Sequence, residues 1–424
     1  MRINRFPFVS IVAFLAIPAG LTAQVSSGPE TRLRADVTWL AADARQGRGV
    51  GTEGLAAAAR YIAARFAEVG LHPVEGDDDF LHPFTISPSA PAAAHAGVGG
   101  EEVANVVGVF PGTGAFRNQT VFVGAHYDHL GLGGFGSLDP DSVHVVHNGA
   151  DDNASGTAAM IEVARQLVQR ADQTGSRRTI VFVAFTGEEL GLLGSDHFVE
   201  EFAASPDATL AMVNMDMVGR LSEGKLAAFG AETATEFPTL LDSLNQSYHF
   251  ELAASGDGYG RSDQQSFYAK DIPVLHFFSG THEDYHRTTD DAERINYEGL
   301  ARIAGFVADL TWNLATREGS LTFVDAEPPQ QQVAGGYGAY LGTIPDMTES
   351  PDGVRLTGVR AGSPAEQAGI MAGDVIIAIG DIEVNDLYDM TDALRSFRPG
   401  DTTVIRVRRQ DQEVELSATF GSRG

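Results

Sequence analysis

The 424-residue sequence contains no cysteine. Disulfide bonds, thiolate metal ligands and a cysteine nucleophile are therefore excluded, and so is a lipid anchor on an N-terminal cysteine. Any metal ion would have to be held by histidine and carboxylate side chains. That set of donors favours zinc, manganese or a related ion.

Basic residues are scarce. The 29 Lys and Arg face 57 Asp and Glu, which gives a formal net charge of −28. Nucleic acids and anionic membranes are bound mainly through clustered basic side chains. The composition therefore argues against both classes of partner.

The N-terminus lacks an uninterrupted apolar run long enough for a confident membrane span. Residues 1–5 are basic, and residues 6–21 are mostly apolar but interrupted by proline, serine and glycine. This pattern predicts a secretory signal peptide over residues 1–23, with an uncleaved signal anchor as the alternative. We therefore expect a secreted or periplasmic bacterial protein without a stable membrane anchor.

Nearly continuous apolar runs alternate with segments of helical periodicity over much of the chain. Such runs are typical of strands that are covered on both faces, and their alternation with helices predicts an α/β fold with a mostly parallel, or mixed, central sheet flanked by helices. Residues 74–102 are rich in Pro, Ala, Gly and acidic residues, and we expect an irregular surface segment there. The predicted strands are 105–110, 120–125, 179–185, 210–215 and 273–278, and the predicted helices fall within 31–73, 153–171, 189–203, 235–248, 263–270 and 296–315.

The composition and periodicity of the sequence change after residue 317. Residues 318–335 contain two adjacent prolines and three glutamines without periodicity, which indicates a linker. Short strands and turns follow over residues 336–420. We expect a separate small α+β domain there.

Histidine and carboxylate residues follow several of the predicted strands. In open α/β sheets, ligands bind at the carboxyl ends of the strands, and an acidic Gly/Asn-rich turn at residues 147–156 opens onto a buried helix. The residues in question are His126 and Asp128, Asp151 and Asp152, Glu188 and Glu189, Asp216, and His286.

The number of potential ligands predicts a centre with two metal ions. One zinc ion usually takes three protein ligands and a water, so five side chains serve two ions if one carboxylate is shared. Asp151, on the rigid turn, is the candidate for the shared ligand. Glu188 is then free to act as a general base on a metal-activated water. The five predicted ligands are His126, Asp151, Glu189, Asp216 and His286.

These motifs together resemble the co-catalytic di-zinc aminopeptidases, the family that includes aminopeptidase Y and bacterial leucyl aminopeptidases. The resemblance covers about residues 31–317 and includes the N-terminal stretch 47–52. It rests on the sequences of residues 126–128, 149–156, 187–195 and 214–217 and on His286. It implies a zinc exopeptidase fold of the phosphorylase/hydrolase-like type, and an enzyme that releases N-terminal residues from peptides with a free N-terminus.

The resemblance also implies roles for individual residues. One zinc would take His126 and Asp216, the other Glu189 and His286, with Asp151 between them. Asp128 would orient the His126 ring. Asp152 would follow the shared ligand across a bond that is often cis in this family, and Asp290 would brace the loop of His286 without binding metal. Zinc is implied, although manganese or cobalt would suit the same ligands.

The C-terminal segment resembles a bacterial PDZ domain over residues 336–420. The resemblance rests on Tyr340-Leu341-Gly342 and on the stretches 363–370 and 373–376. Such domains bind extended C-terminal peptides by strand addition. Tyr340, Leu341 and Gly342 would form the loop that receives the terminal carboxylate.

Two other functions stay open at this point. The same fold could carry a different amide reaction, such as that of a carboxypeptidase or a glutaminyl cyclase, because substrate choice depends on the loops. Alternatively, the protein could be an inactive scaffold led by its PDZ domain, although an intact Glu188 argues against this. The preferred N-terminal residue, the physiological substrate, the PDZ ligand and the oligomeric state do not follow from the sequence.

Overall fold

The computed structural model describes residues 28–421 except for 140–141, 143, 203–207, 261, 326–338, 346–352, 361, 381, 385–388, 391–392, 395 and 411. The predicted signal peptide (residues 1–23) and residues 326–335 of the predicted linker lie outside the described residues. No helix within the described part combines the length and apolar character needed to cross a membrane.

An eight-stranded mixed sheet forms the centre of the N-terminal part, with the strand order β1-β2-β4-β3-β5-β8-β6-β7. The four central strands β4, β3, β5 and β8 run parallel to one another, as their continuous apolar sequences predicted. The bounds are β1 Leu81–Thr85, β2 Glu102–Phe110, β3 Thr120–His126, β4 Thr179–Phe185, β5 Thr209–Met215, β6 Lys225–Phe229, β7 Glu251–Ser255 and β8 Val274–Phe278.

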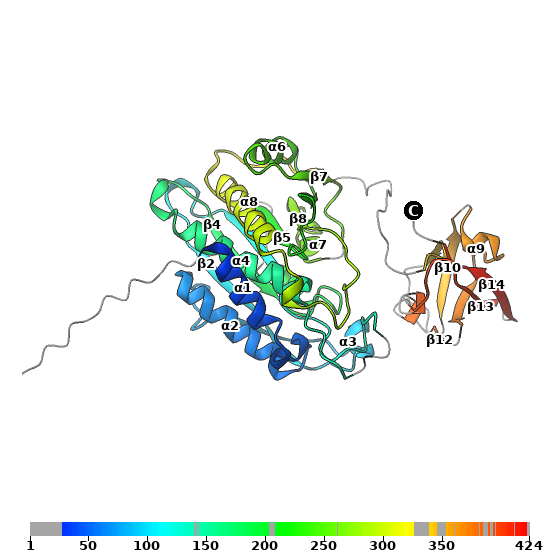
Figure 1. Ribbon diagram of the computed structural model, residues 1–424. Helices are drawn as coiled ribbons and strands as arrows, with labels where there is room; N and C mark the ends of the chain where they lie inside the picture. The colour runs from blue at the N-terminus through cyan, green and yellow to red at the C-terminus, as the bar shows by residue number, and fades with distance from the viewer. Residues whose placement is uncertain are drawn as a thin grey trace, which may run out of the picture.

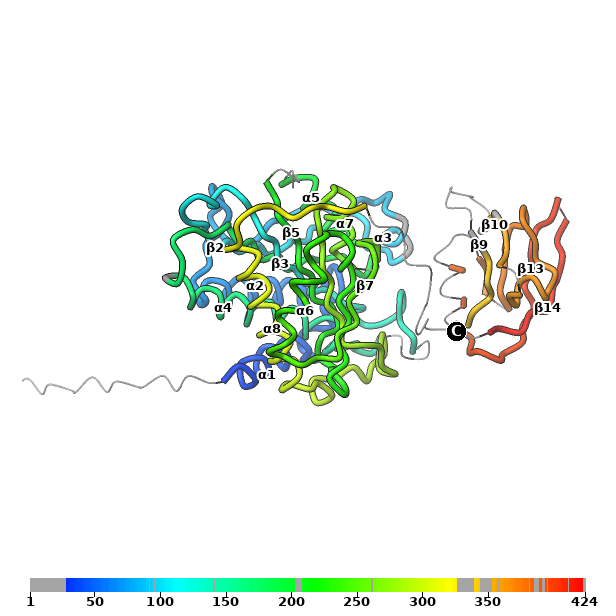
Figure 2. Tube along the Cα trace, turned by 90° about the horizontal axis from the view of Figure 1, so that it is seen from above, coloured from blue at the N-terminus to red at the C-terminus, as the bar shows by residue number. Residues whose placement is uncertain are grey.

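Helices cover both faces of this sheet (Figures 1 and 2). The larger apolar core lies under α1, α2, α4, α6 and α8, and a smaller aromatic core lies under α5 and α7 on the other face. The bounds are α1 Pro29–Leu40, α2 Glu53–Val69, α3 Pro91–His95, α4 Gly156–Val168, α5 Leu193–Glu201, α6 Phe237–Tyr248, α7 Gln264–Tyr268 and α8 Tyr297–Thr316.

Local sequence signals explain where the long helices begin and end. The Thr52 hydroxyl accepts a hydrogen bond from the Leu55 backbone N–H at the start of α2, and Gly70 ends that helix with φ 96°. Asn296 caps α8 through the Gly299 N–H in the same way. These caps fix the ends of α2 and α8, whose buried apolar residues belong to the larger core.

Three strands were missed by the sequence patterns. The predicted irregular segment 74–102 contains β1 and the short helix α3, and β6 and β7 were not predicted at all. β1 is an edge strand interrupted by Pro83, which weakens its strand pattern. β7 is the other edge strand and is largely exposed. Neither has the continuous apolar sequence of the central strands.

The C-terminal part is a second, antiparallel sheet with its own core. Its main order is β14-β13-β11-β10-β9, with β12 paired to β11. Buried apolar side chains such as Leu356, Ile376 and Ile405 fill it. The bounds are β9 Thr343–Pro345, β10 Val354–Val359, β11 Val375–Ile379, β12 Ile382–Glu383, β13 Thr402–Arg409 and β14 Gln412–Thr419, with helix α9 at Pro364–Gln367.

Candidate metal centre

The carboxyl ends of three parallel strands bring the first group of predicted residues together. His126 is the last residue of β3, Glu188 and Glu189 follow β4, and Asp216 follows β5. The Nε2 atom of His126 lies 3.3 Å from Asp216 Oδ1 and 4.0 Å from Glu188 Oε2. All four side chains thus meet at one edge of the sheet.

His286 reaches the same edge from the loop between β8 and α8. Its Nε2 atom lies 3.2 Å from Glu189 Oε2 and 3.1 Å from Asp152 Oδ2. The other oxygen of Asp152, Oδ1, lies 3.4 Å from His126 Nε2. One carboxylate, that of Asp152, therefore stands between the two imidazoles.

The prediction that Asp151 is the shared ligand does not agree with this geometry. Asp151 Oδ1 accepts a hydrogen bond of 2.6 Å from the Gly219 backbone N–H, and Oδ2 lies 3.1 Å from His282 Nε2. Its carboxylate is thus used inside the fold. The cis peptide bond also lies one residue later than predicted, between Asp152 and Asn153. Because neighbouring side chains on a tight turn point in different directions, the sequence alone could not decide which aspartate faces the histidines.

Asp290 supports the acidic turn directly. Its Oδ2 atom accepts hydrogen bonds from the backbone N–H groups of Asp151 (2.9 Å) and Asp152 (3.1 Å). Burial raises the pKa of Asp290 to about 7, and the nearby Asp151 adds to the shift. The side chain was predicted to brace the loop of His286, and it braces the turn of Asp152 instead.

Arg48 is a further supporting residue that was not singled out from the sequence. It is fully buried, and its guanidinium donates hydrogen bonds of 2.7–2.9 Å to the backbone carbonyls of Leu40, Tyr127, Asn148 and Gly149. Burial lowers its pKa to about 10. The only signal for it in the sequence is its place in the stretch 47–52 that resembles secreted aminopeptidases.

Asp128 holds both the His126 ring and the loop of Glu188. Its Oδ1 atom lies 3.7 Å from His126 Nδ1 and accepts a 3.2 Å hydrogen bond from the Glu188 N–H. The Asp128 backbone carbonyl lies 3.2 Å from the same ring nitrogen. A carbonyl can only accept, so Nδ1 carries the hydrogen and Nε2 is left for the centre.

The His286 ring is oriented by the insertion that follows β3. Its Nδ1 atom donates a 2.7 Å hydrogen bond to the Gly136 carbonyl, which again leaves Nε2 for the centre. Asp139 connects this insertion to the two residues that follow His286. It accepts hydrogen bonds from the Arg287 guanidinium (2.7 Å) and from the Thr288 N–H (2.9 Å). The insertion that follows β3 is therefore a support for His286.

His129 also lies at the centre, although it was not among the predicted site residues. Its Nδ1 atom is 2.7 Å from Glu189 Oε1 and 3.8 Å from Asp152 Oδ2. The contact with Glu189 makes it a neighbour of the ligand set, where it can orient that carboxylate.

The carboxylates dominate the electrostatics of the centre. Burial lowers the pKa of His126 and His286, but the surrounding acids outweigh it: Asp216 and Glu188 raise the pKa of His126 well above its usual value, and Glu189 and Asp152 raise that of His286 to about 10. Burial raises the pKa of Glu188 well above its usual range. Side chains that hold protons this strongly show that the centre favours positive charge. A metal cation would supply that charge.

The donor set and its spacing fit metal ions. Donors that share one tetrahedral zinc at roughly 2.0–2.2 Å lie a little over 3 Å from one another. The pairs His126–Asp216, His126–Asp152, His286–Asp152 and His286–Glu189 all lie at 3.1–3.4 Å. Asp216 Oδ1 is also buried without a hydrogen-bond partner among the described residues. Two ions with Asp152 between them would satisfy these atoms.

A cavity of about 440 Å³ opens onto this centre. Its lining includes the acidic residues and histidine Asp152, Glu188, Glu189, Asp216 and His286. The rest of the lining is largely aromatic and apolar, and consists of Met217, Phe229, Tyr259, Phe278 and Tyr285 together with Gly260, Gln264 and His276. A substrate side chain in this cavity would lie against apolar walls with its backbone at the carboxylates.

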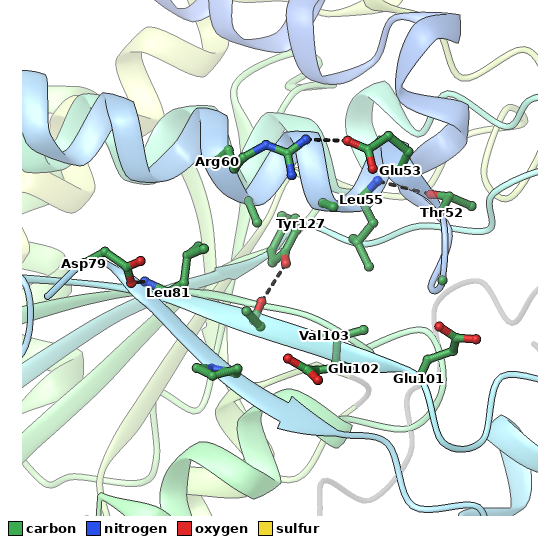
Figure 3. Close-up of a pocket in the computed structure, with 15 residues that line it drawn as sticks. Thr52, Glu53, Leu55, Arg60, Asp79, Leu81, Glu101, Glu102, Val103 and Tyr127 are labelled. Atoms are coloured by element: carbon green, nitrogen blue, oxygen red, sulfur yellow. Dashed lines mark hydrogen bonds and ion pairs between the residues drawn. The ribbon is translucent and has the colours of Figure 1, made fainter. Parts of the chain in front are cut away.

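Two further cavities lie near the site. One of about 470 Å³ is lined by His129, Glu189 and the glycine-rich segment 130–135. Another, of about 580 Å³, lies between α2 and strands β1 and β2 (Figure 3) and contains none of the predicted metal ligands. The cavity of 440 Å³ is thus the one whose lining combines apolar residues with the proposed ligands other than His126.

Comparison with known proteins gives the family of the segment that carries the metal centre. Residues 105–311 match the model of Peptidase family M28, and residues 339–419 match the PDZ domain model. The segment that carries the centre is a member of Peptidase family M28. The C-terminal segment is a PDZ domain.

Curated relatives of the M28 segment are named as aminopeptidases. A "Probable leucine aminopeptidase" of Trichophyton verrucosum is 27% identical over 223 residues, which is 49% of this chain and 55% of the relative. "Aminopeptidase YwaD" of Bacillus subtilis is 29% identical over 224 residues, which is 50% of this chain and 45% of the relative. The chain thus spans about half the length of the curated relatives it matches.

Solved structures share the fold. A structure titled as a zinc aminopeptidase from Bacillus subtilis is 18% identical with a TM-score of 0.53, and the match covers 68% of this chain and 95% of that one. A glutaminyl cyclase from Bacteroides thetaiotaomicron is 16% identical with a TM-score of 0.53, covering 67% and 97%. The predicted mixed α/β zinc-exopeptidase fold is confirmed, and at these identities the likeness extends to the fold alone.

Proposed function

We propose that this protein is a secreted metallo-aminopeptidase that removes N-terminal residues from peptides with the help of two zinc ions. The observation that carries the proposal is the Asp152 carboxylate, whose two oxygens lie 3.4 and 3.1 Å from the Nε2 atoms of His126 and His286. The family membership of residues 105–311 and the names of the relatives support the activity.

The ligand set divides into two halves around Asp152. His126 and Asp216 would hold one ion, and His286 and Glu189 the other, and Asp152 would be shared by both. When bound, the ions would supply Lewis acidity to the scissile carbonyl and to the attacking water. Manganese or cobalt would suit the same nitrogen and oxygen donors.

Glu188 is the proposed general base. Glu188 lies beside the ligand set but is not one of the proposed ligands of either ion. The Asp128 carboxylate accepts a hydrogen bond from its backbone N–H. Burial raises its pKa, so it is able to accept a proton from the attacking water and to hold it. It then delivers that proton to the amine of the departing peptide.

The cavity supports release of single apolar residues. Asp152, Glu188, Glu189 and Asp216 form an acidic side suited to a cationic free N-terminus. The apolar part of the lining, which includes Phe229 and Phe278, would receive the first side chain. We therefore propose a preference for substrates with a large apolar N-terminal residue.

The metal requirement can be tested with the purified full chain and a leucyl amide that releases a chromophore. We expect a chelator to abolish hydrolysis, and added zinc to restore it. Full activity after the metal has been removed, verified by elemental analysis, would refute the proposal.

For the PDZ domain we propose binding of peptides with a free C-terminal carboxylate. The domain is proposed to span residues 336–420, and the peptidase domain 31–317. The linker predicted at 318–335 starts too early, because the Thr235 N–H donates to the Thr322 carbonyl (3.1 Å) and the Val324 N–H to the Thr233 carbonyl (2.9 Å). β9 lies at the end of the strand order, so among the described strands its outer edge has no partner and could receive an added strand. Tyr340, Leu341 and Gly342 lead into it, and at Gly342 (φ 83°) a Cβ would lie 2.3 Å from Ser363 Cβ.

Secretion and peptide binding by the PDZ domain each have a direct test. Mass spectrometry of the protein expressed in a bacterium should find a mature chain that lacks residues 1–23 outside the cytoplasm. A fluorescent peptide with a free C-terminus should bind the full chain, and its amidated form should not. Equal binding of both peptides would contradict the role of the Tyr340–Gly342 loop.

A further inference from the structure

A second group of histidine and carboxylate residues lies outside the proposed catalytic centre. It consists of His82 on β1 and His197 and Glu201 on α5. One donor atom from each of the three lies within 4.8 Å of the others. None of the three lines the cavities described above.

The alternation of β1 directs His82 toward α5. Leu81 rises from β1 toward α2 and lines the 580 Å³ cavity there (Figure 3). Successive side chains of a strand point to opposite faces, so His82 faces the other side of the sheet. Its partner on β2, Asn105, lies on that side too and donates a 2.8 Å hydrogen bond to the Gly194 carbonyl of α5.

The distances suit three ligands of one ion. His197 and Glu201 are four residues apart on α5, which places them on one face of the helix, with Nε2 2.8 Å from Glu201 Oε2. His82 Nδ1 lies 3.8 Å from the same oxygen. Ligands of one tetrahedral zinc are a little over 3 Å apart, given metal–ligand bonds of about 2.0–2.2 Å. The two measured distances, 2.8 and 3.8 Å, lie on either side of that separation.

The two ring nitrogens lack the hydrogen bonds that an ordinary ion pair would give them. His82 Nδ1 and His197 Nε2 are both buried, and neither makes a hydrogen bond of good geometry with the described residues although each lies near Glu201. A hydrogen bond needs the N–H to point at the oxygen, whereas ligands of one ion direct their lone pairs to a point between them. The helical pair His197–Glu201 also does not explain why His82 points to the same place.

Aromatic neighbours hold the two rings in position. The His82 ring lies 4.7 Å from the Phe202 ring, and the His197 ring stacks on Phe84 at 4.7 Å with an interplanar angle of 21°. Rings fixed in this way lose little freedom when an ion binds. The side chains of His82, His197 and Glu201 are 13%, 34% and 51% exposed, so an ion can reach them from solvent.

We propose that His82, His197 and Glu201 bind one further divalent transition-metal ion, and we expect that ion to be zinc. Two imidazoles and a carboxylate are donors for zinc and its neighbours rather than for calcium or magnesium, which take mainly oxygen. Three protein ligands leave a position for water. The ion would join the edge strand β1 to the end of α5, the helix that follows the Glu188–Glu189 loop.

The test is the number of zinc ions bound by the dialysed full chain, measured by elemental analysis and by titration of the metal-free protein with zinc. We expect three ions per chain for the unchanged protein and two for the double variant His82→Gln/Glu201→Gln. The exposed neighbour Glu200 supplies a matched control, and Glu200→Gln should keep three. The His126→Ala/His286→Ala variant should keep the one ion held by the second group.

Thermal unfolding of the same variants provides a second measurement. In a background of His126→Ala/His286→Ala, added zinc should raise the melting temperature, and the His82→Gln/Glu201→Gln changes should remove that rise. An unchanged zinc count and an unchanged rise in the double variant would overturn the proposal. A single ion in the unchanged protein that disappears in His82→Gln/Glu201→Gln would instead overturn the two-zinc centre and leave this site standing.

Discussion

Asp151 and Asp152 are adjacent in the chain, yet their carboxylates face different parts of the molecule. Asp152 reaches both imidazoles of the centre, at 3.4 Å from His126 and 3.1 Å from His286. Asp151 accepts the Gly219 N–H at 2.6 Å. The turn therefore contributes one aspartate to the proposed metal centre and uses the other to hold itself in place.

This division predicts different effects for the two matched variants. Asp152→Asn removes the charge shared by both halves of the centre, and we expect it to lower the zinc content and to reduce kcat/KM by at least about 100-fold. Asp151→Asn can still accept the Gly219 hydrogen bond, so it should keep both ions and most of the activity. Elemental analysis with kinetics checks both. Loss of zinc in Asp151→Asn together with full occupancy in Asp152→Asn would restore the assignment made from the sequence.

The proposed role of Glu188 predicts a loss of turnover without a loss of metal. Glu188→Gln keeps the size of the side chain but cannot accept a proton, so we expect kcat to fall by about 10²–10⁴-fold. Zinc content and the melting temperature should stay near those of the unchanged protein. The exposed Glu200→Gln serves as the control. Undiminished turnover in Glu188→Gln would refute its assignment as the base.

The raised pKa values of the two histidines predict that zinc binding releases protons. A raised pKa means that the metal-free ring is protonated at neutral pH, and a metal ligand must give up that proton. His286, with a pKa of about 10, and His126, with a pKa well above its usual value, are both in this state. At pH 7 we expect roughly two protons released per pair of ions, one from each ring, and fewer as the pH rises through about 10.

Calorimetric titration of the metal-free protein in buffers of different ionisation enthalpy measures this number. The experiment is best done in the His82→Gln/Glu201→Gln background, so that the second group of ligands does not contribute. A binding enthalpy that is independent of the buffer at pH 7 would show that no protons are released. That result would contradict the picture of protonated histidines in the metal-free centre.

The apolar wall of the cavity predicts the order of substrates. Phe229 lines it and is 41% exposed in the absence of substrate. Phe229→Ala should reduce kcat/KM for a leucyl or phenylalanyl amide by roughly 10-fold, the scale of one apolar contact in a pocket, and should affect an alanyl amide much less. Met371→Ala, which changes an exposed apolar side chain of the PDZ domain, is the control. An equal loss for all three substrates would exclude Phe229 from the specificity pocket.

The central strands and most of the site residues could be predicted because one physical rule connects them. Continuous apolar runs mark strands buried on both faces, and the residues that follow parallel strands must meet at one edge. His126, Glu188 and Asp216 were predicted in this way, and β3, β4 and β5 do bring them together.

Other features could not be predicted because they depend on turns and on edge strands. The sequence could not distinguish Asp151 from Asp152, since the direction of each side chain is set by the backbone of the turn and by Asp290 and Arg48, which come from distant parts of the chain. β1 is interrupted by His82 and Pro83, and β6 is short, with only four apolar residues after Lys225. The residues that they supply, His82 and Phe229, were therefore missed.

The most direct test of the proposed activity compares a free with a blocked N-terminus. Purified full-length protein with zinc would be given leucyl chromogenic amide, its N-acetylated form and a peptide reporting release of the C-terminal residue, together with an N-terminal glutaminyl peptide to detect cyclisation. The proposed aminopeptidase should cleave only free-amine substrates, and chelator should abolish the cleavage. Cleavage of the acetylated amide at an equal rate, or no cleavage with two zinc ions bound at the Asp152 centre, would contradict it.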